Sequence, residues 1–186
     1  LIEEQFKLYY QPMVNLNNGE ITTVEALLRW PQPDGSMIGP DQFIPLAESS
    51  GLINDLGRWV IQQACFYCAQ QRKQGYSNLR VAVNLSVIQF KDGQLQNIVE
   101  SALLDANLPP QALELELELT ESLLIDETEQ IQKQLKLLSL LGITIAIDDF
   151  GTGYSNLGYL RNFNASTLKI DRSFITPLSV TKQDEP

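Results

Sequence analysis

Acidic and amide side chains recur in this chain at the points where predicted strands end. Six candidate positions share this placement: Glu25, Asn84, Glu118, Asp148, Asp149 and Lys169. In a fold of alternating strands and helices, the carboxyl ends of the strands meet at one face, where active sites normally lie. Carboxylates, one amide and one ammonium gathered there would form an oxygen-rich site suited to hard divalent cations. The sequence therefore predicts a site that holds metal ions against a phosphate.

The sharpest of these signals is the pair Asp148 and Asp149. Neighbouring residues on a strand point to opposite faces, but where a strand ends the chain turns and both side chains can face one cation. A lone pair of acids is more often a helix-capping residue beside a solvated one. The following segment, FGTGY at 150–154, favours the functional interpretation because its two glycines permit positive φ angles beside the acids. Such a loop is typical of an element that closes over a site.

Glu25 is a candidate because it lies among apolar neighbours, where a buried carboxylate must be paired or bind a metal. Arg29 follows four residues later, and its guanidinium could bind a phosphate through two hydrogen bonds. A surface salt bridge explains the same spacing equally well. Lys169 lies between two apolar residues, and a buried lysine is costly unless it serves anionic groups or titrates downward.

Two other strand ends are less specific. A single asparagine such as Asn84 at a strand end is more often a turn former than a ligand. In the run LELELELTE, Glu114, Glu116 and Glu118 alternate with leucines and share one face. Only the glutamate nearest the strand end is expected to reach the site.

Composition limits the partners. The chain has 186 residues, 44% of them hydrophobic, which suffices for one well-buried domain and hardly for two. Its formal net charge of -10 repels a nucleic-acid backbone, so duplex DNA or RNA is not an expected partner. A small phosphorylated ligand can bind if metal ions neutralise it locally. The sequence has no histidine, which removes the commonest zinc ligand and the usual proton shuttle.

The two cysteines, Cys65 and Cys68, have the C-x-x-C spacing of redox and zinc sites. They lie within a helical pattern, and a zinc site would need two further nitrogen or sulfur ligands that the sequence lacks. We interpret them as ordinary helix residues of a protein from a reducing compartment. The longest nearly apolar stretch, 137–147, is about half of the ~20 residues that a membrane span needs. We expect a cytoplasmic domain, whose parent protein could be membrane-anchored.

Periodicity predicts a first strand pair joined by the turn residues Asn17, Asn18 and Gly19, which makes that pair antiparallel. Alternating strands and helices follow. The expected strands cover 6–14, 20–30, 79–85, 113–119, 143–147 and 167–170. Residues 31–40 are expected to form a loop, which leads to a short helix that begins near Asp41. Further helices are expected at 54–74, 94–106 and about 127–141. Asp126 and Glu129 form a predicted capping box at the start of the last of these helices.

Six strands of this pattern fit either an open doubly wound sheet or most of an eight-stranded barrel. An open sheet binds its ligand at one topological switch point. The candidate site residues come from five different strands, which a closed ring accommodates better. We therefore expect a β/α barrel with two strands missing.

Seven motifs, taken in order, resemble the EAL-domain family of cyclic di-GMP phosphodiesterases. They are YYQP at 9–12, EALLRW at 25–30, FIPLAE at 43–48, VNLS at 83–86, ELTES at 118–122, DDFGTGYSNL at 148–157 and LKID at 168–171. The match covers essentially the whole chain. The order of the motifs makes the resemblance specific, although each motif alone is weak.

The resemblance implies a modified TIM barrel whose first strand is antiparallel. It implies Mg²⁺ or Mn²⁺ in a two-metal site. The implied metal ligands are Glu25, Asn84, Glu118, Asp148 and Asp149. Lys169 would lie near the attacking water, and Glu121 would brace the DFGTGY loop, which in the family also links the site to a dimer interface.

Three further residues, Gln11, Arg29 and Asp171, would by the same analogy contact the dinucleotide. The implied reaction is metal-dependent hydrolysis of one phosphodiester bond of cyclic di-GMP to linear pGpG in bacterial signalling. The resemblance also implies a homodimer whose parent protein fuses this domain to sensor or GGDEF-type domains. The alternative function is a catalytically silent cyclic di-GMP receptor.

Two departures from the family pattern stand out. The segment LELELEL carries an extra Glu-Leu step, which preserves the two faces of the strand because two residues are one strand period. Glu118 is our choice of ligand, with Glu116 as the alternative. The sequence also lacks the family's last two strands and starts within its first helix, so we expect residues 1–186 to form a single EAL-like domain that is an incomplete barrel.

Overall fold

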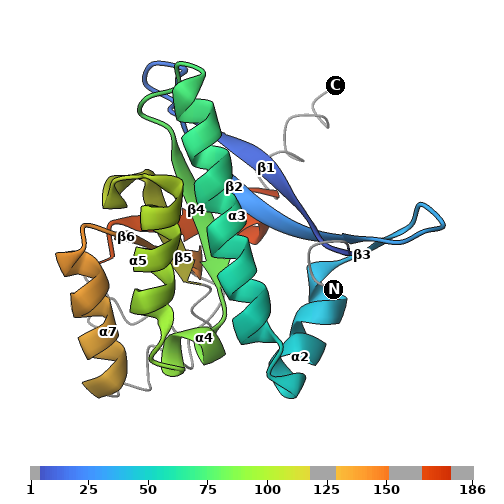
Figure 1. Cartoon of the computed structure of the whole chain (residues 1–186). Helices are drawn as coiled ribbons and strands as arrows, with labels where there is room; N and C mark the ends of the chain where they lie inside the picture. Colours follow the sequence, from blue (N-terminus) through green and yellow to red (C-terminus); the bar gives the residue numbers. More distant parts are fainter. Residues whose placement is uncertain (1–4, 118–128, 151–164, 177–186) are drawn as a thin grey trace, which may run out of the picture.

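The structure, a computed structural model, describes residues 5–117, 129–150 and 165–176, and gives only the backbone for 113–117, 129, 130 and 149. The described residues form a mixed sheet covered by helices (Figure 1). The strands are β1 (Lys7–Val14), β2 (Ile21–Pro31), β3 (Met37–Ile38), β4 (Arg80–Leu85), β5 (Leu113–Leu117), β6 (Thr144–Phe150) and β7 (Thr167–Ile170). The helices are α2 (Pro40–Ser50), α3 (Ile53–Lys73), α4 (Val87–Lys91), α5 (Leu95–Ala106) and α7 (Glu129–Leu140), with 3-10 turns η1 (Pro110–Ala112) and η2 (Arg172–Phe174).

The expected strand order is confirmed. β1 and β2 pair antiparallel, and every later step along β2-β4-β5-β6-β7 is parallel. The turn of the hairpin contains Gly19, which has a φ angle of 74°, a conformation that glycine adopts without strain. Gly142, with φ 82°, follows the end of α7 as predicted. The predicted capping box lies partly outside the described residues, because Asp126 does.

Three elements differ from the prediction. β3 forms inside the expected loop 31–40 and pairs with β2, so the predicted count of six strands is wrong for the described residues. Two residues are too short to give a periodic signal. Helix α4 was also missed, although Ser86 and Gln89 form the capping box that opens it. β6 runs on to Phe150, so Asp148 and Asp149 lie inside a strand rather than beyond its end.

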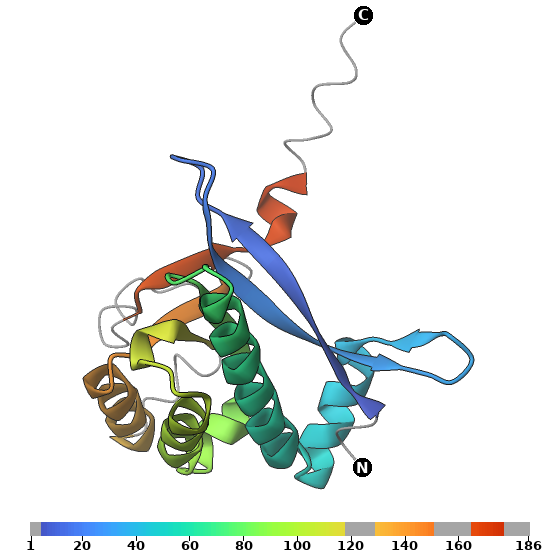
Figure 2. The same ribbon diagram turned by 45° about the horizontal axis from the view of Figure 1, so that its top comes forward.

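Helices α3, α5 and α7 cover one face of the sheet (Figures 1 and 2). The strands contribute alternate residues to this core; in β4, for example, Val81 and Val83 are fully buried against the helices. Tyr10 of β1 stacks on Tyr67 of α3 with ring centroids 3.5 Å apart. Burial raises the pKa of Tyr10, so its hydroxyl stays protonated in this core.

The sheet is strongly curled. β2 and β7 lie four strand steps apart, which in a flat sheet would separate them by about 19 Å. Nevertheless, the Lys169 ammonium of β7 lies 3.1 Å from a carboxylate oxygen of Glu25 in β2. Figure 2 shows β7 returning towards the β1–β2 ribbon. The described strands therefore bend around a common interior, although they do not close into a ring among themselves.

Both cysteines are residues of helix α3, as predicted, and both face the hydrophobic core. Cys65 and Cys68 are fully buried and free. Burial raises the pKa of the Cys65 thiol to about 12 and also raises that of Cys68. Their thiols are thus uncharged structural groups. In the described part of the chain, no helix is long and apolar enough to span a membrane.

The helix-facing core yields a prediction from two neighbouring leucines of α5. Leu103 is 5% exposed and Leu104 is 80% exposed. Leu103→Ala should lower the free energy of unfolding by about 2–5 kcal/mol because it leaves a cavity. Leu104→Ala is the matched control and should change it by less than ~0.5 kcal/mol. Urea denaturation of both variants measures the difference, and equal losses would contradict this assignment of the core.

Candidate active site

The site is centred on Lys169, whose ammonium lies between two carboxylates. Its Nζ donates to Glu25 Oε2 at 3.1 Å and to Asp148 Oδ2 at 2.8 Å. The three side chains are 23%, 16% and 19% exposed respectively, so water screens the charges only partly. Lys169 is therefore not a buried lysine without partners; it joins β2, β6 and β7 at one point.

Asn84 of β4 completes this group. Its Nδ2 donates to Glu25 Oε1 at 2.9 Å. A carboxylate can only accept, so the amide must present its NH₂ group to Glu25 and its oxygen elsewhere. That oxygen, Asn84 Oδ1, is buried and has no hydrogen-bond partner in the described part of the chain. A buried amide oxygen without a donor is costly in a protein interior, and a cation would satisfy it.

The alternation of the strands explains why these side chains converge. In β4, Val81, Val83 and Leu85 pack against the helices, so Ala82 and Asn84 face the inside of the curled sheet. The same parity in β6 places Ala146 and Asp148 on that inner face. Alanine at the deeper position leaves space, and the polar residue follows towards the carboxyl end of the strand.

Asp148 and Asp149 lie where the β6–β7 ladder breaks register. Pairing is regular as far as Ile147 with Leu168 and resumes at Phe150 with Ile170, so a bulge or similar irregularity separates the two contacts. A bulge redirects side chains that strict alternation would send to opposite faces, and bulges are common beside active sites. The prediction that the strand ends and the chain turns at these acids is therefore wrong, because β6 continues through an irregularity to Phe150.

The three predicted substrate contacts lie on β1, on β2 and at the start of η2. Gln11 of β1 pairs directly with Glu25, which places the two side chains on one face. Arg29 shares the parity of Glu25, and its Nη1 donates to the backbone oxygen of Leu28. Asp171 caps η2 by accepting from the Ser173 amide. Hydrogen bonds from Ser173 lower the pKa of the Asp171 carboxyl, so it is charged. Their contact with a ligand stays a prediction.

Several predicted residues are not placed. Glu118, Glu121 and residues 151–157 of the glycine-bearing loop lie outside the described residues, and so does the side chain of Asp149. The backbone of Glu116 pairs with Asn84 on one side and Ala146 on the other, next to the site. The choice between Glu118 and Glu116 stays a prediction.

The donors present fit a hard divalent cation. Within the described side chains, no three His, Cys, Asp or Glu residues gather closely enough to hold an ion by themselves. Two carboxylates and the open amide oxygen of Asn84 do converge, and all three offer oxygen. Oxygen donors are the ligands of Mg²⁺ and Mn²⁺. The donor set therefore fits the predicted metals and disfavours zinc.

Comparisons with known proteins identify the family of the chain. The family model of the EAL domain matches residues 1–185. The bifunctional diguanylate cyclase/cyclic di-GMP phosphodiesterase MucR of Pseudomonas aeruginosa is 45% identical over 184 residues, which are 99% of this chain and 27% of that protein. The cyclic di-GMP phosphodiesterase NbdA of the same organism is 42% identical over 184 residues, covering 99% of this chain and 23% of that protein.

A solved structure, the PaMucR phosphodiesterase in complex with c-di-GMP, superimposes with a TM-score of 0.87 at 45% identity, covering 95% of this chain and 71% of that chain. The chain belongs to the EAL domain family. It spans roughly a quarter of the length of the two curated relatives. The predicted family resemblance is thus confirmed.

The bridging role of Lys169 predicts a specific pattern of stability. Lys169→Met leaves two partly buried carboxylates without their shared cation, so the free energy of unfolding in EDTA should fall by about 1–3 kcal/mol. Adding Glu25→Gln removes one negative charge and should recover part of the loss. Denaturant unfolding of both variants measures this.

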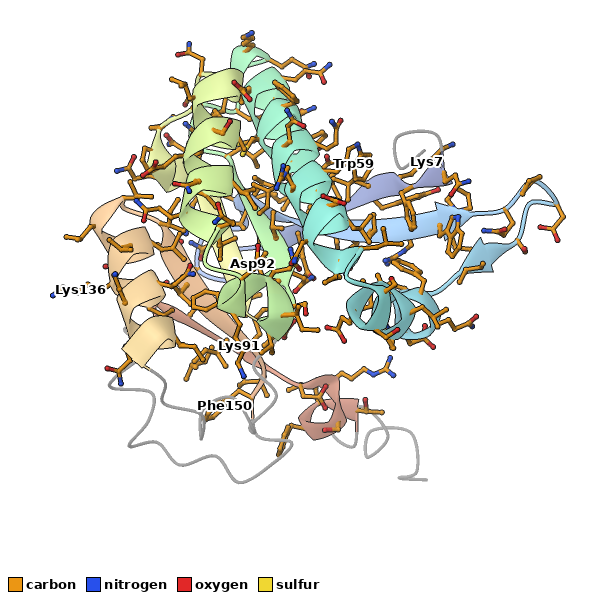
Figure 3. The ribbon with its side chains drawn as sticks, turned by 60° about the horizontal axis from the view of Figure 1, so that its bottom comes forward. Lys7, Trp59, Lys91, Asp92, Lys136 and Phe150 are labelled. Carbon is orange, nitrogen blue, oxygen red and sulfur yellow. The ribbon has the colours of Figure 1, made fainter. Side chains whose placement is uncertain are left out.

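A matched control is Lys136→Met, at an exposed position on α7 (Figure 3), which should change stability by less than ~0.5 kcal/mol. If Lys169→Met and Lys136→Met behave alike, the ammonium does not hold the site together.

Proposed function

We propose that this chain carries most of the active site of a metal-dependent phosphodiesterase that hydrolyses cyclic di-GMP to linear pGpG. The observation that carries the proposal is the convergence of Glu25, Asn84, Asp148 and Lys169 from four strands. Membership of the EAL domain family supports the substrate, because relatives bear the name cyclic di-GMP phosphodiesterase and a solved relative is a c-di-GMP complex. The curled sheet would be a modified TIM barrel with an antiparallel first strand, of which the described strands form an incomplete ring.

The charge balance favours a metal-assisted reaction. The chain has a formal net charge of -10, and the substrate is an anion as well. Binding therefore needs local positive charge, of which Lys169 supplies one unit that Glu25 and Asp148 already neutralise. In our proposal Glu25, Asn84 and Asp148, with Asp149 and Glu118, hold Mg²⁺ or Mn²⁺. When bound, such ions would supply the positive charge that lowers the pKa of a water and offsets the negative charge of the attacking and leaving oxygens.

The chain's own residues would position the reactants. Lys169 would hold Glu25 and Asp148 in place and lie near the attacking water. Gln11, Arg29 and Asp171 orient the dinucleotide, and Glu121 braces the loop that follows Asp149. The water oxygen adds to one phosphorus, the bond from that phosphorus to the 3′ oxygen breaks, and a proton ends on the 3′ oxygen. One of the two phosphodiester bonds stays intact, which gives the linear product.

We also propose the setting in which the domain acts. Because the chain spans 27% of MucR, whose name joins a diguanylate cyclase to a phosphodiesterase, we expect a cytoplasmic domain fused to sensor or GGDEF-type domains. We expect a homodimer in solution and no binding to duplex DNA or RNA, since the net charge of -10 repels both.

The function is tested by incubating the natural protein that contains this chain with cyclic di-GMP and Mg²⁺ or Mn²⁺. We expect linear pGpG, detected by chromatography, and no product in EDTA. Absence of turnover at every metal concentration would reject the hydrolase. Tight binding of cyclic di-GMP in EDTA without turnover would instead identify the receptor, which is the second candidate.

Glu25 should be essential for turnover, because it contacts both Asn84 and Lys169. Glu25→Ala should lower kcat by at least ~100-fold, as expected for loss of a metal ligand, while circular dichroism stays unchanged. Glu20→Ala, an exposed glutamate before β2, is the matched control and should keep full activity. Unfolding of Glu25→Ala would show that Glu25 is structural instead.

A further inference from the structure

A second polar contact lies close to Asn84 and joins Ser86 to Glu48, neither of which is among the predicted site residues. Ser86 Oγ donates to Glu48 Oε1 of α2 at 2.5 Å, and both side chains are half-buried. A hydroxyl bound to a carboxylate at this distance is a strong, charge-assisted hydrogen bond. It joins residues 38 positions apart in the chain, so it fixes tertiary rather than local structure.

The turn that receives this bond is the one that presents Asn84. Ser86 is the N-cap of α4, and its Oγ also accepts from the Ile88 amide at 3.2 Å. Gln89 Oε1 accepts from the Ser86 backbone amide at 3.0 Å, and Gln89 is only 8% exposed. Between Asn84 and Ser86, Leu85 is buried in the core. Glu48 thus anchors one end of a short segment whose other end is Asn84.

Close packing holds the elements around this segment in place: α3 packs on α4, and α2 packs on β2. A Cβ atom on Gly57 of α3 would lie 1.6 Å from Gln89 Nε2, so α3 and α4 can approach only because Gly57 has no side chain. α2 packs through Phe43 against Trp30 of β2, the strand that also carries Glu25. In Figure 3, Lys91 and Asp92 at the end of α4 lie on the same side of the molecule as Phe150 at the end of β6.

The position of Glu48 argues against a role in helix stability. It lies in the last turn of α2, where the helix dipole disfavours an acid. A carboxylate there costs a few tenths of a kcal/mol unless a tertiary contact offsets the cost. Ser86 provides that contact.

We propose that Glu48 is a positioning residue, which holds Ser86 and thereby orients Asn84 for cation binding. The proposal rests on the proposed function only in naming Asn84 a cation ligand. Glu48 touches neither substrate nor metal. Its effect passes through the turn from Asn84 to Gln89, which it locks to α2 and hence to β2.

The first test is backbone hydrogen exchange in the natural protein without metal. In Glu48→Ala, the Ile88 amide should exchange about tenfold faster, because the Ser86 hydroxyl that it contacts has lost its partner. Glu48→Gln keeps an acceptor oxygen and should restore most of the protection. Glu100→Ala is the matched control, since Glu100 on α5 also accepts a side-chain bond, from Gln96, away from this turn. Unchanged exchange at Ile88 in Glu48→Ala would overturn the proposal.

The second test is the affinity for Mn²⁺ measured by calorimetry. Glu48→Ala should weaken binding about tenfold, as loss of an outer contact to a metal site does, and Glu48→Gln should recover it. Ser86→Gly keeps an acceptable N-cap but removes the hydroxyl. It should reproduce the effect of Glu48→Ala, and the double variant should be no weaker than either single variant. Additive losses, or faster exchange with unchanged affinity, would overturn the positioning role.

These readouts separate the proposal from the function on which it rests. Mn²⁺ binding that weakens in Glu48→Ala, in a protein without turnover, would reject the hydrolase and leave the positioning role intact. Absence of Mn²⁺ binding in the unchanged protein would overturn both, and the exchange data would then report only a structural clamp. If Glu48→Ala does not fold, Ser86→Gly gives the same comparison.

Discussion

The ion pairs of Lys169 impose the constraint on which the rest of the site depends. An ammonium that contacts Glu25 and Asp148 at 3.1 Å and 2.8 Å requires β2, β6 and β7 to surround one point. Four strand steps separate β2 from β7, so the sheet must curl to bring them together. Asn84 lies on β4, the strand directly beside β2 and two residues beyond the Ala82 that pairs with Glu25, so it too reaches Glu25. The contacts of Lys169 are thus possible only in a curled sheet, and they hold Glu25 and Asp148 together on its inner face.

One face of the strands packs against the helices and stabilises the fold, and the other face carries the polar residues of the site. Large apolar side chains such as Val81, Val83 and Ile147 pack on the helices and are at most 1% exposed. The inner face carries small residues, Ala82 and Ala146, followed by polar ones. Burying the helix side provides the hydrophobic free energy that offsets the cost of gathering charged groups on the other side. Polar substitutions on the inner face therefore change the site more than the fold.

Strand periodicity made most of this predictable. β7 lies where the sequence indicated, and the antiparallel hairpin follows from its turn residues. It was harder to predict which carboxylates lie together, because that depends on the curvature of the sheet, which no local sequence pattern encodes. Asp148 illustrates this. The sequence predicts that Asp148 and Lys169 belong to one site, but it predicts neither their direct contact nor the register shift beside Asp148. Helix α4 carried a readable signal in Ser86 and Gln89, whereas the two-residue β3 carried none.

The amide of Asn84 links the geometry to the choice of ion. Its NH₂ group is committed to Glu25, which only accepts, so its buried oxygen must find a donor or a cation. An aspartate at this position would place a second negative charge against Glu25, and an alanine would leave Glu25 without that contact. An amide is the side chain that can bond the carboxylate and still offer an oxygen to a cation. The requirement for asparagine thus follows from its neighbour, and it explains why a residue that usually forms turns occupies the end of this strand.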